Sequence, residues 1–188
     1  AIKGSELSPP LLEKVDLRAC KTRLGYEISP QLIGSGLSHM AIYDYALSQE
    51  FKWIMVLEED VKIEFEKFFE TDLIQIIKRF ESVQQGIIIQ LFSRGTRLTS
   101  DFKWNRFGNH NLFRFLPRLI GSGAPAYLIN DKALAKYKKN GKLQGAPDWP
   151  PWSVGISFYG IYPWPVYESG MNSTVPQNWQ RRAEYLIR

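Results

Sequence analysis

The feature that most constrains the fold is an uninterrupted apolar run, Trp53–Leu57, that stops at an acidic triplet, residues 58–60. Because the run shows no alternation of apolar and polar residues, it predicts a strand covered on both faces, as in the middle of an α/β sheet. A second, mostly apolar run spans residues 87–92, and apolar residues recur at helical spacing between the two, over residues 64–82. Alternation of helix and buried strand predicts an α/β/α sandwich with a mostly parallel central sheet.

Capping signals place further elements along the chain. Ser29-Pro30 offers an N-cap followed by proline at the first helical position, so a helix is expected to begin there, or after Gly36, and to run to about Ser48. Residues 126–129 predict a strand, and a basic helix is expected from Asp131 to about residue 140. Residues 93–111 are polar and predict a long loop. Since the sequence contains no repeats, we expect a single domain over residues 1–188.

Composition excludes several classes of site. Cys20 is the only cysteine and His39 and His110 are the only histidines, so neither an internal disulfide nor a histidine-rich metal site is expected. A metal site would rest on carboxylates, which suit Mn²⁺ or Mg²⁺. The cysteine usage favours a reducing compartment, the cytoplasm. The net charge of +5 is not concentrated in a stripe, so no nucleic-acid partner is expected, and no apolar run reaches the roughly 20 residues of a membrane-spanning helix.

The acidic triplet predicts a cation site. In an extended chain, residues i and i+2 face the same side, so Glu58 and Asp60 would converge while Glu59 points elsewhere. Open α/β sheets bind ligands beyond the carboxyl ends of their strands, and neighbouring carboxylates repel unless a cation compensates. The ordinary alternative is that the triplet solubilises a strand end and favours the N-terminus of the following helix.

Several segments together resemble glycosyltransferase family 25, which includes bacterial lipooligosaccharide galactosyl- and glucosyltransferases. The main matches are IGSGLSH at residues 33–39 and WIMVLEEDV at residues 53–61. Further matches are AIKG at residues 1–4, GAPAYLI at residues 123–129, and Pro147-Asp148. The resemblance implies a GT-A-like (Rossmann-like) fold, a UDP-sugar donor and a metal site of the Asp-x-Asp type.

The resemblance also implies roles for individual residues. Glu58 and Asp60 would hold the metal ion, while Ser38, His39 and Glu59 would contact the donor. His39, as a lone histidine on a helix, has the alternative of a structural role. Glu59 stands where the family commonly has aspartate. Family members begin with a strand and a helix that precede the segment matched by residues 1–4, so we expect this chain to lack that nucleotide-binding segment.

Asp148 is the candidate general base. An inverting transfer needs one carboxylate to take the proton of the acceptor hydroxyl, and Asp148 is flanked by aromatic rings that exclude water. The alternative is that Asp148 caps a short helical turn followed by prolines. Asp101 is a second candidate in the long loop.

Aromatic and basic residues predict contacts with the substrates. Trp149 and Trp152, with Trp164 and Tyr167, would form an acceptor platform, unless they only pack. Arg94 follows the 87–92 run and would bind phosphate.

The leading expectation is therefore an enzyme that transfers galactose or glucose from a UDP-sugar to a lipooligosaccharide or lipopolysaccharide acceptor, assisted by Mn²⁺ or Mg²⁺. Its location would be cytoplasmic, with peripheral contact at the cytoplasmic face of the inner membrane. The alternative is a non-catalytic glycan-binding domain derived from such an enzyme.

Overall fold

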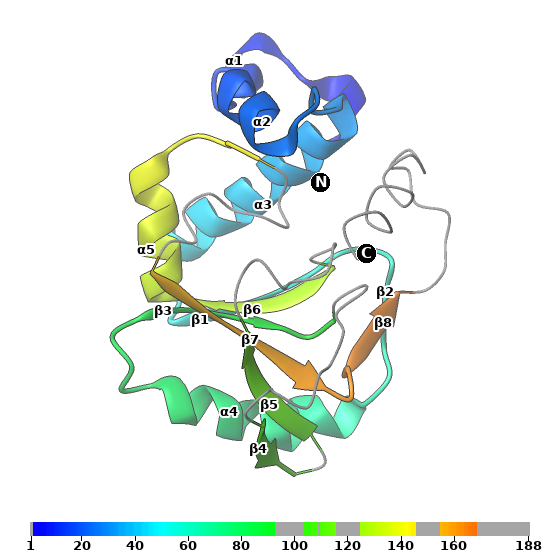
Figure 1. Cartoon of the computed structure of the whole chain (residues 1–188), viewed down its shortest axis with the longest axis vertical. Coiled ribbons are helices and arrows are strands. Elements are labelled where there is room, and N and C mark those ends of the chain that lie inside the picture. Colours follow the sequence, from blue (N-terminus) through cyan, green and yellow to red (C-terminus); the bar gives the residue numbers. More distant parts are fainter. Residues whose placement is uncertain (1, 93–103, 109, 116–124, 146–154, 169–188) are drawn as a thin grey trace.

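The computed structural model describes residues 2–92, 104–108, 110–115, 125–145 and 155–168. The strands are β1 (Trp53–Leu57), β2 (Val61–Ile63), β3 (Gly86–Gln90), β4 (Trp104–Phe107), β5 (His110–Phe115), β6 (Ala126–Asn130), β7 (Ile156–Tyr162) and β8 (Val166–Glu168). The helices are η1 (Gly4–Glu6), α1 (Pro9–Leu12), α2 (Leu17–Leu24), α3 (Pro30–Ser48), η2 (Phe68–Asp72), α4 (Leu73–Phe80) and α5 (Asp131–Asn140). Helices α3 and α5 lie on one side of the main sheet and α4 on the other (Figure 1).

The main sheet is mixed rather than mostly parallel. Its described strands have the order β1-β6-β3-β7-β5-β4, and four of their five neighbouring pairs are antiparallel; only β3 and β7 pair in parallel. The prediction of a mostly parallel sheet was therefore wrong. Strands β1 and β3 do run in the same direction, as the intervening helix suggested, but β6 lies between them and runs opposite to both. Helix–strand alternation indicates the direction of connected strands, not which strand separates them.

Strand β1 lies at one edge of the sheet formed by the described strands, not in its middle. Its residues Met55 and Leu57 are 40% and 39% exposed, so only part of the apolar run is covered. The run correctly indicated a strand, but apolar character on both faces did not mean burial on both faces. Likewise, the segment expected to be a long loop contains β4 and the start of β5, which form an antiparallel hairpin.

Alternate residues of the central strands feed two separate cores. In β3, Ile88 faces the side of α3 and α5, whereas Ile87 and Ile89 face α4. In β6, Tyr127 and Ile129 belong to the first core and Ala126 and Leu128 to the second. Each fully buried isoleucine contributes about 1.5–3 kcal/mol through removal of its side chain from water. The mostly apolar sequence of these strands follows from this two-sided burial.

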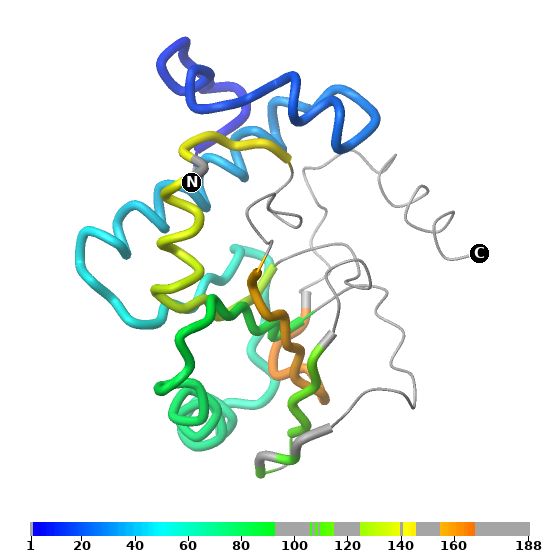
Figure 2. The backbone as a smooth tube through the Cα atoms, turned by 60° about the vertical axis from the view of Figure 1, so that its left-hand side comes forward, coloured from blue at the N-terminus to red at the C-terminus, as the bar shows by residue number. Residues whose placement is uncertain are grey.

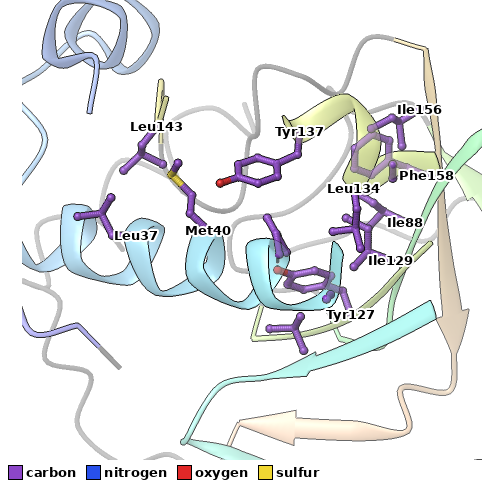
Figure 3. Close-up of a cluster of buried hydrophobic side chains, with 14 of the residues drawn as sticks. Leu37, Met40, Ile88, Tyr127, Ile129, Leu134, Tyr137, Leu143, Ile156 and Phe158 are labelled. Atoms are coloured by element: carbon purple, nitrogen blue, oxygen red, sulfur yellow. Dashed lines mark hydrogen bonds between the residues drawn. The ribbon is translucent and has the colours of Figure 1, made fainter. Parts of the chain in front are cut away.

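Helix α3 begins where the capping signal indicated. The Ser29 hydroxyl accepts a hydrogen bond from the Leu32 amide at 3.3 Å, and Pro30 occupies the first helical position. The helix packs against α5 and the segment after it, with Leu37 and Met40 close to Leu143 (Figure 3). Alternative initiation after Gly36 is therefore excluded.

The segment before α3 is hydrogen-bonded to the residues that follow α5. Val15 forms a parallel bridge with Leu143, and the Leu143 amide donates to the Lys14 carbonyl at 2.8 Å. The first helices thus lie beside residues 142–145 (Figure 2). Within the described residues, no helix combines the length and apolar character needed to span a bilayer.

Candidate functional site

The acidic triplet lies in a turn at the end of β1. The Glu58 amide donates to the Pro125 carbonyl at 2.7 Å, which extends the contact with the segment leading into β6. The Val61 amide then donates to the Glu58 carbonyl at 3.3 Å and closes a tight turn with Glu59 and Asp60 in the middle. The chain is therefore not extended here, and the alternation argument for pairing Glu58 with Asp60 does not apply. The two carboxylates still share one corner of the sheet.

A two-stranded antiparallel ladder, β2 with β8, holds the acidic turn at its C-terminal end. Strand β2 begins at Val61, immediately after the turn, and pairs antiparallel with β8, with Val61 opposite Glu168 and Ile63 opposite Val166. The Glu64 amide also donates to the Pro165 carbonyl at 3.0 Å. The turn is thus held between β1 and a ladder made with a segment about 100 residues later.

The Glu58 carboxylate ends a chain of hydrogen bonds that starts in the core. His39 Nε2 lies 3.3 Å from Glu58 Oε1, and His39 Nδ1 lies 2.6 Å from the Tyr127 hydroxyl. The Tyr127 hydroxyl is also hydrogen-bonded to that of Tyr43. His39, Tyr43 and Tyr127 are only 6%, 6% and 4% exposed, whereas the Glu58 side chain is 37% exposed. The chain therefore connects a buried aromatic cluster to a carboxylate at the surface.

Buried acceptors without partners lie at the same end of the sheet. Asp60 Oδ1 and Gln90 Oε1 are buried and have no hydrogen-bond partner among the described residues. Gln90 is the last residue of β3 and lies directly opposite Tyr127 of β6 in the strand register. A buried acceptor without a donor costs about 1–3 kcal/mol, more if it is charged. Both side chains thus suit a ligand that brings a cation or a hydroxyl group.

The residues at this corner fit a divalent cation that is also held by substrate. The described residues contain no cluster of three or more His, Cys, Asp or Glu side chains placed around a common point. Mg²⁺ sites need no such cluster, because one or two carboxylates together with substrate phosphates and water commonly complete the octahedron. Glu58 and Asp60 supply two carboxylates, and the unpartnered oxygen of Asp60 fits this role.

Ser38 contacts the N-terminal segment in this structure. Its hydroxyl accepts a hydrogen bond from the Ile2 amide at 2.7 Å and donates to the Gly34 carbonyl at 2.9 Å. A β-carbon on Gly34 would lie 2.5 Å from the Ile2 carbonyl oxygen, and one on Gly4 would lie 2.6 Å from the Pro30 carbonyl carbon. The glycines of the 1–4 and 33–39 segments therefore let the two backbones pack closely. The expected donor contact of Ser38 stays a prediction.

Aromatic residues from the late segment pack near the same end of the sheet. Trp164 is 9% exposed and its ring contacts those of Phe92 and Phe113, so it belongs to the core. Tyr167 is 37% exposed and packs against Phe92. Of these two expected platform residues, only Tyr167 is open to an acceptor. Other predicted site residues lie outside the described part of the chain: Arg94, Asp101, Asp148, Trp149 and Trp152.

The second histidine has a buried role that the sequence did not suggest. His110 is 4% exposed, and its Nδ1 lies 3.0 Å from Asp72 Oδ2, on the α4 side of the sheet. His110 lies within residues 93–111, which were expected to form a polar loop, but the structure buries it against a partner 38 residues away in the sequence. The rings of Phe65 and Phe68 pack against it.

Sequence reasoning missed Tyr127, Tyr43 and Gln90. Tyr127 and Gln90 each interrupt an otherwise apolar strand with a polar group near its carboxyl or amino end, and that interruption is the signal available in the sequence. Tyr43 lies four residues after His39 on α3, on the same helical face.

Comparison with known proteins adds one finding to this geometry. The family model described as glycosyltransferase family 25 (LPS biosynthesis protein) matches residues 1–141, which include α3, the acidic turn, β3 and β6. No curated protein matches the chain.

Proposed function

The chain belongs to glycosyltransferase family 25, whose members act in lipopolysaccharide biosynthesis, and on that premise we propose which sugar, metal and residues it uses. The protein is a transferase. We propose that it transfers galactose or glucose from a UDP-sugar to a lipooligosaccharide acceptor, with Mn²⁺ or Mg²⁺ held at the acidic turn. The family fold implied for it is GT-A-like. Its glycolipid acceptor would bring it to the cytoplasmic face of the inner membrane.

The observation that carries the proposal is the pair of carboxylates at the end of β1. Glu58 is partly exposed and oriented by His39, while Asp60 has a buried oxygen with no partner among the described residues. A side chain that only needs to solubilise a strand end would have both oxygens in water. The two carboxylates therefore support a role in binding. Glu58 is held in place by His39, and Asp60 has an oxygen that a ligand could contact.

Each group has a distinct part in the proposed transfer. A divalent cation, when bound, neutralises charge that develops on the diphosphate leaving group. Glu58 and Asp60 would hold it, and Glu59, at the tip of the turn, would contact the donor. Arg94 would bind the diphosphate through paired hydrogen bonds.

The acceptor side is proposed from the sequence. Asp148 would accept the proton of the attacking hydroxyl as a general base. Trp149 and Trp152 would stack on the acceptor sugar, and the exposed ring of Tyr167 extends that surface among the described residues.

A donor screen tests the proposal. UDP release from UDP-galactose and UDP-glucose is measured with a lipooligosaccharide acceptor, with and without Mn²⁺, for the wild type, Asp60→Asn and Glu64→Gln. Glu64 is an exposed carboxylate four residues after Asp60 and serves as the matched control. Asp60→Asn should lower metal-dependent release by more than the roughly 10- to 100-fold typical of losing an outer partner of a metal ligand. Glu64→Gln should leave it unchanged.

Two results would contradict the proposal in different ways. Full wild-type activity in excess chelator would show that the transfer does not need a metal ion. Equal activity of Asp60→Asn and the wild type would show that Asp60 is not part of the active site, whatever the metal requirement.

A further inference from the structure

We propose that Tyr127, acting through His39, is a positioning residue that fixes the Glu58 carboxylate for the cation and the donor. Tyr127 touches neither substrate nor ion in this scheme. The inference rests on the proposed function in one respect, namely that Glu58 contacts the metal ion. The arrangement of the hydroxyl and imidazole groups is independent of that assignment.

The hydrogen bonds between Tyr43 and Glu58 can all run in one direction. A carboxylate only accepts, so His39 Nε2 must donate to Glu58 across their 3.3 Å contact. In a neutral ring, Nδ1 then accepts, and the donor 2.6 Å away is the Tyr127 hydroxyl. The Tyr127 oxygen in turn accepts from the Tyr43 hydroxyl. All donors therefore point toward Glu58, and the hydroxyl of Tyr127 selects the Nε2–H tautomer of His39.

The inner end of the chain of hydrogen bonds stays protonated. Burial raises the pKa of Tyr43 far above its ordinary value, and the hydrogen bond with Tyr127 lowers it only in part. Tyr43 therefore keeps its proton and can donate it to the Tyr127 oxygen, while the Tyr127 proton is directed at Nδ1 of a neutral His39.

The backbone that carries Tyr127 is rigid. Tyr127 lies in β6 between two strands, opposite Val56 of β1 and Gln90 of β3, so its backbone is held on both sides. The rings of His39 and Tyr127 are stacked at 10° with their centroids 5.7 Å apart. Tyr127 packs within the first core (Figure 3). The anchor of the chain is thus a central strand, which is more rigid than the turn that carries Glu58.

An apolar core at these positions would be simpler to build. Phenylalanine at both tyrosine positions would fill the same space without burying two hydroxyl groups that must be satisfied. The buried polar groups form one connected series whose outer end is the surface carboxylate Glu58. Outer partners of this kind orient metal ligands in many metalloproteins, and their loss costs roughly 10- to 100-fold in metal affinity or activity.

The test uses Tyr127→Phe, with Tyr137→Phe as the matched control. Tyr137 is 4% exposed and lies in the same core, with its ring against that of Tyr43. Tyr43→Phe is the second variant, with a smaller expected effect because it acts one step farther from Glu58. Thermal melting of each variant establishes that it is folded.

The first readout is the tautomer of His39 in the metal-free protein. Imidazole ¹⁵N shifts distinguish the two neutral tautomers and the charged ring, and the chain has only two histidines, so a His110→Gln variant completes the assignment. We expect the Nε2–H tautomer in the wild type and Tyr137→Phe, and a mixture in Tyr127→Phe. The second readout is Mn²⁺ binding by calorimetry in the presence of UDP, in which Tyr127→Phe should bind about 10-fold more weakly than the wild type.

The outcomes separate this inference from the proposed function. An unchanged tautomer in Tyr127→Phe, a charged or Nδ1–H ring in the wild type, or unchanged Mn²⁺ affinity in Tyr127→Phe would overturn the inference. If the wild type binds no Mn²⁺ even with UDP present, but Tyr127→Phe shows the expected tautomer change, the metal assignment is overturned and the positioning of His39 by Tyr127 is supported.

Discussion

Gly34 and Gly36 lie two residues apart in helix α3 and face different parts of the protein. Replacing each with alanine tests how the N-terminal segment packs. Either substitution gains about 1 kcal/mol of intrinsic helix propensity. The two differ in what the new methyl group meets. At Gly34 the nearest atoms are the backbone of residues 2–4, whereas at Gly36 they are the terminal methyl groups of Leu143.

The magnitude follows from these contacts. At Gly34 the β-carbon would lie 2.5 Å from the Ile2 oxygen, while ordinary contact begins at 3.4 Å, so the segment must move by about 0.9 Å (3.4 − 2.5). That displacement strains the packing by about 1–3 kcal/mol and weakens the 2.7 Å hydrogen bond from the Ile2 amide to Ser38, worth about 1 kcal/mol. After the propensity gain is subtracted, Gly34→Ala should destabilise the protein by about 1–3 kcal/mol.

At Gly36 the β-carbon would lie 2.7 and 2.8 Å from the two terminal carbons of Leu143. A leucine side chain can change rotamer, so most of this clash can be relieved, and the propensity gain offsets the remainder. Gly36→Ala should therefore lie within about 1 kcal/mol of the wild type.

Urea unfolding of both variants and the wild type, fitted with a common slope, measures the difference. Gly34→Ala should be the less stable of the two variants. If Gly34→Ala were as stable as Gly36→Ala, residues 2–4 would not pack on α3 as described, and the close-packing explanation of the glycines would fail.

Three further predictions concern buried polar groups. Asp72→Ala leaves His110 without its partner and should cost about 1–3 kcal/mol in thermal unfolding; the double variant with His110→Phe should lose less than the two single changes added together. Gln90→Leu removes an acceptor that has no partner among the described residues and should raise the unfolding free energy by about 1 kcal/mol in urea, and a fall would reveal a partner. Burial, and next the charge of Asp16, raises the pKa of the Cys20 thiol, so a thiol reagent at pH 8 should label the folded protein far more slowly than the unfolded one. The same shift contributes stability below the unfolded thiol pKa of about 8.5, and this contribution is lost as the pH rises through the folded value, so Cys20→Ala should flatten the alkaline limb of stability against pH.

The elements of the fold were predictable where their signals are local. The cap at Ser29 and Pro30 fixed the start of α3, and the apolar runs located β1, β3 and β6 to within a residue or two. The order and direction of the strands were not predictable in this way. The position of β6 between β1 and β3 depends on contacts between residues more than 30 positions apart, which no local pattern encodes.

For the candidate site too, local signals were predictable and long-range contacts were not. Glu58, Asp60 and His39 were predicted as site residues because they stand in recognisable motifs, and the structure brings Glu58 and His39 into contact. Their orientation was not predictable, because the chain turns at the triplet where an extended strand was expected. Tyr127 was read only as part of a core strand, since the sequence does not show that its hydroxyl lies beside an imidazole 88 residues earlier.

The ladder between β2 and β8 has a mechanical consequence for the acidic turn. Asp60 is joined directly to β2, and β2 pairs with β8 through backbone hydrogen bonds, so a displacement of either strand would be expected to move the turn that carries the carboxylate. Tyr167 lies in β8, directly opposite Lys62. If the acceptor stacks on Tyr167 and the acidic turn binds the donor, as proposed, binding of one substrate would be coupled to binding of the other through these two short strands.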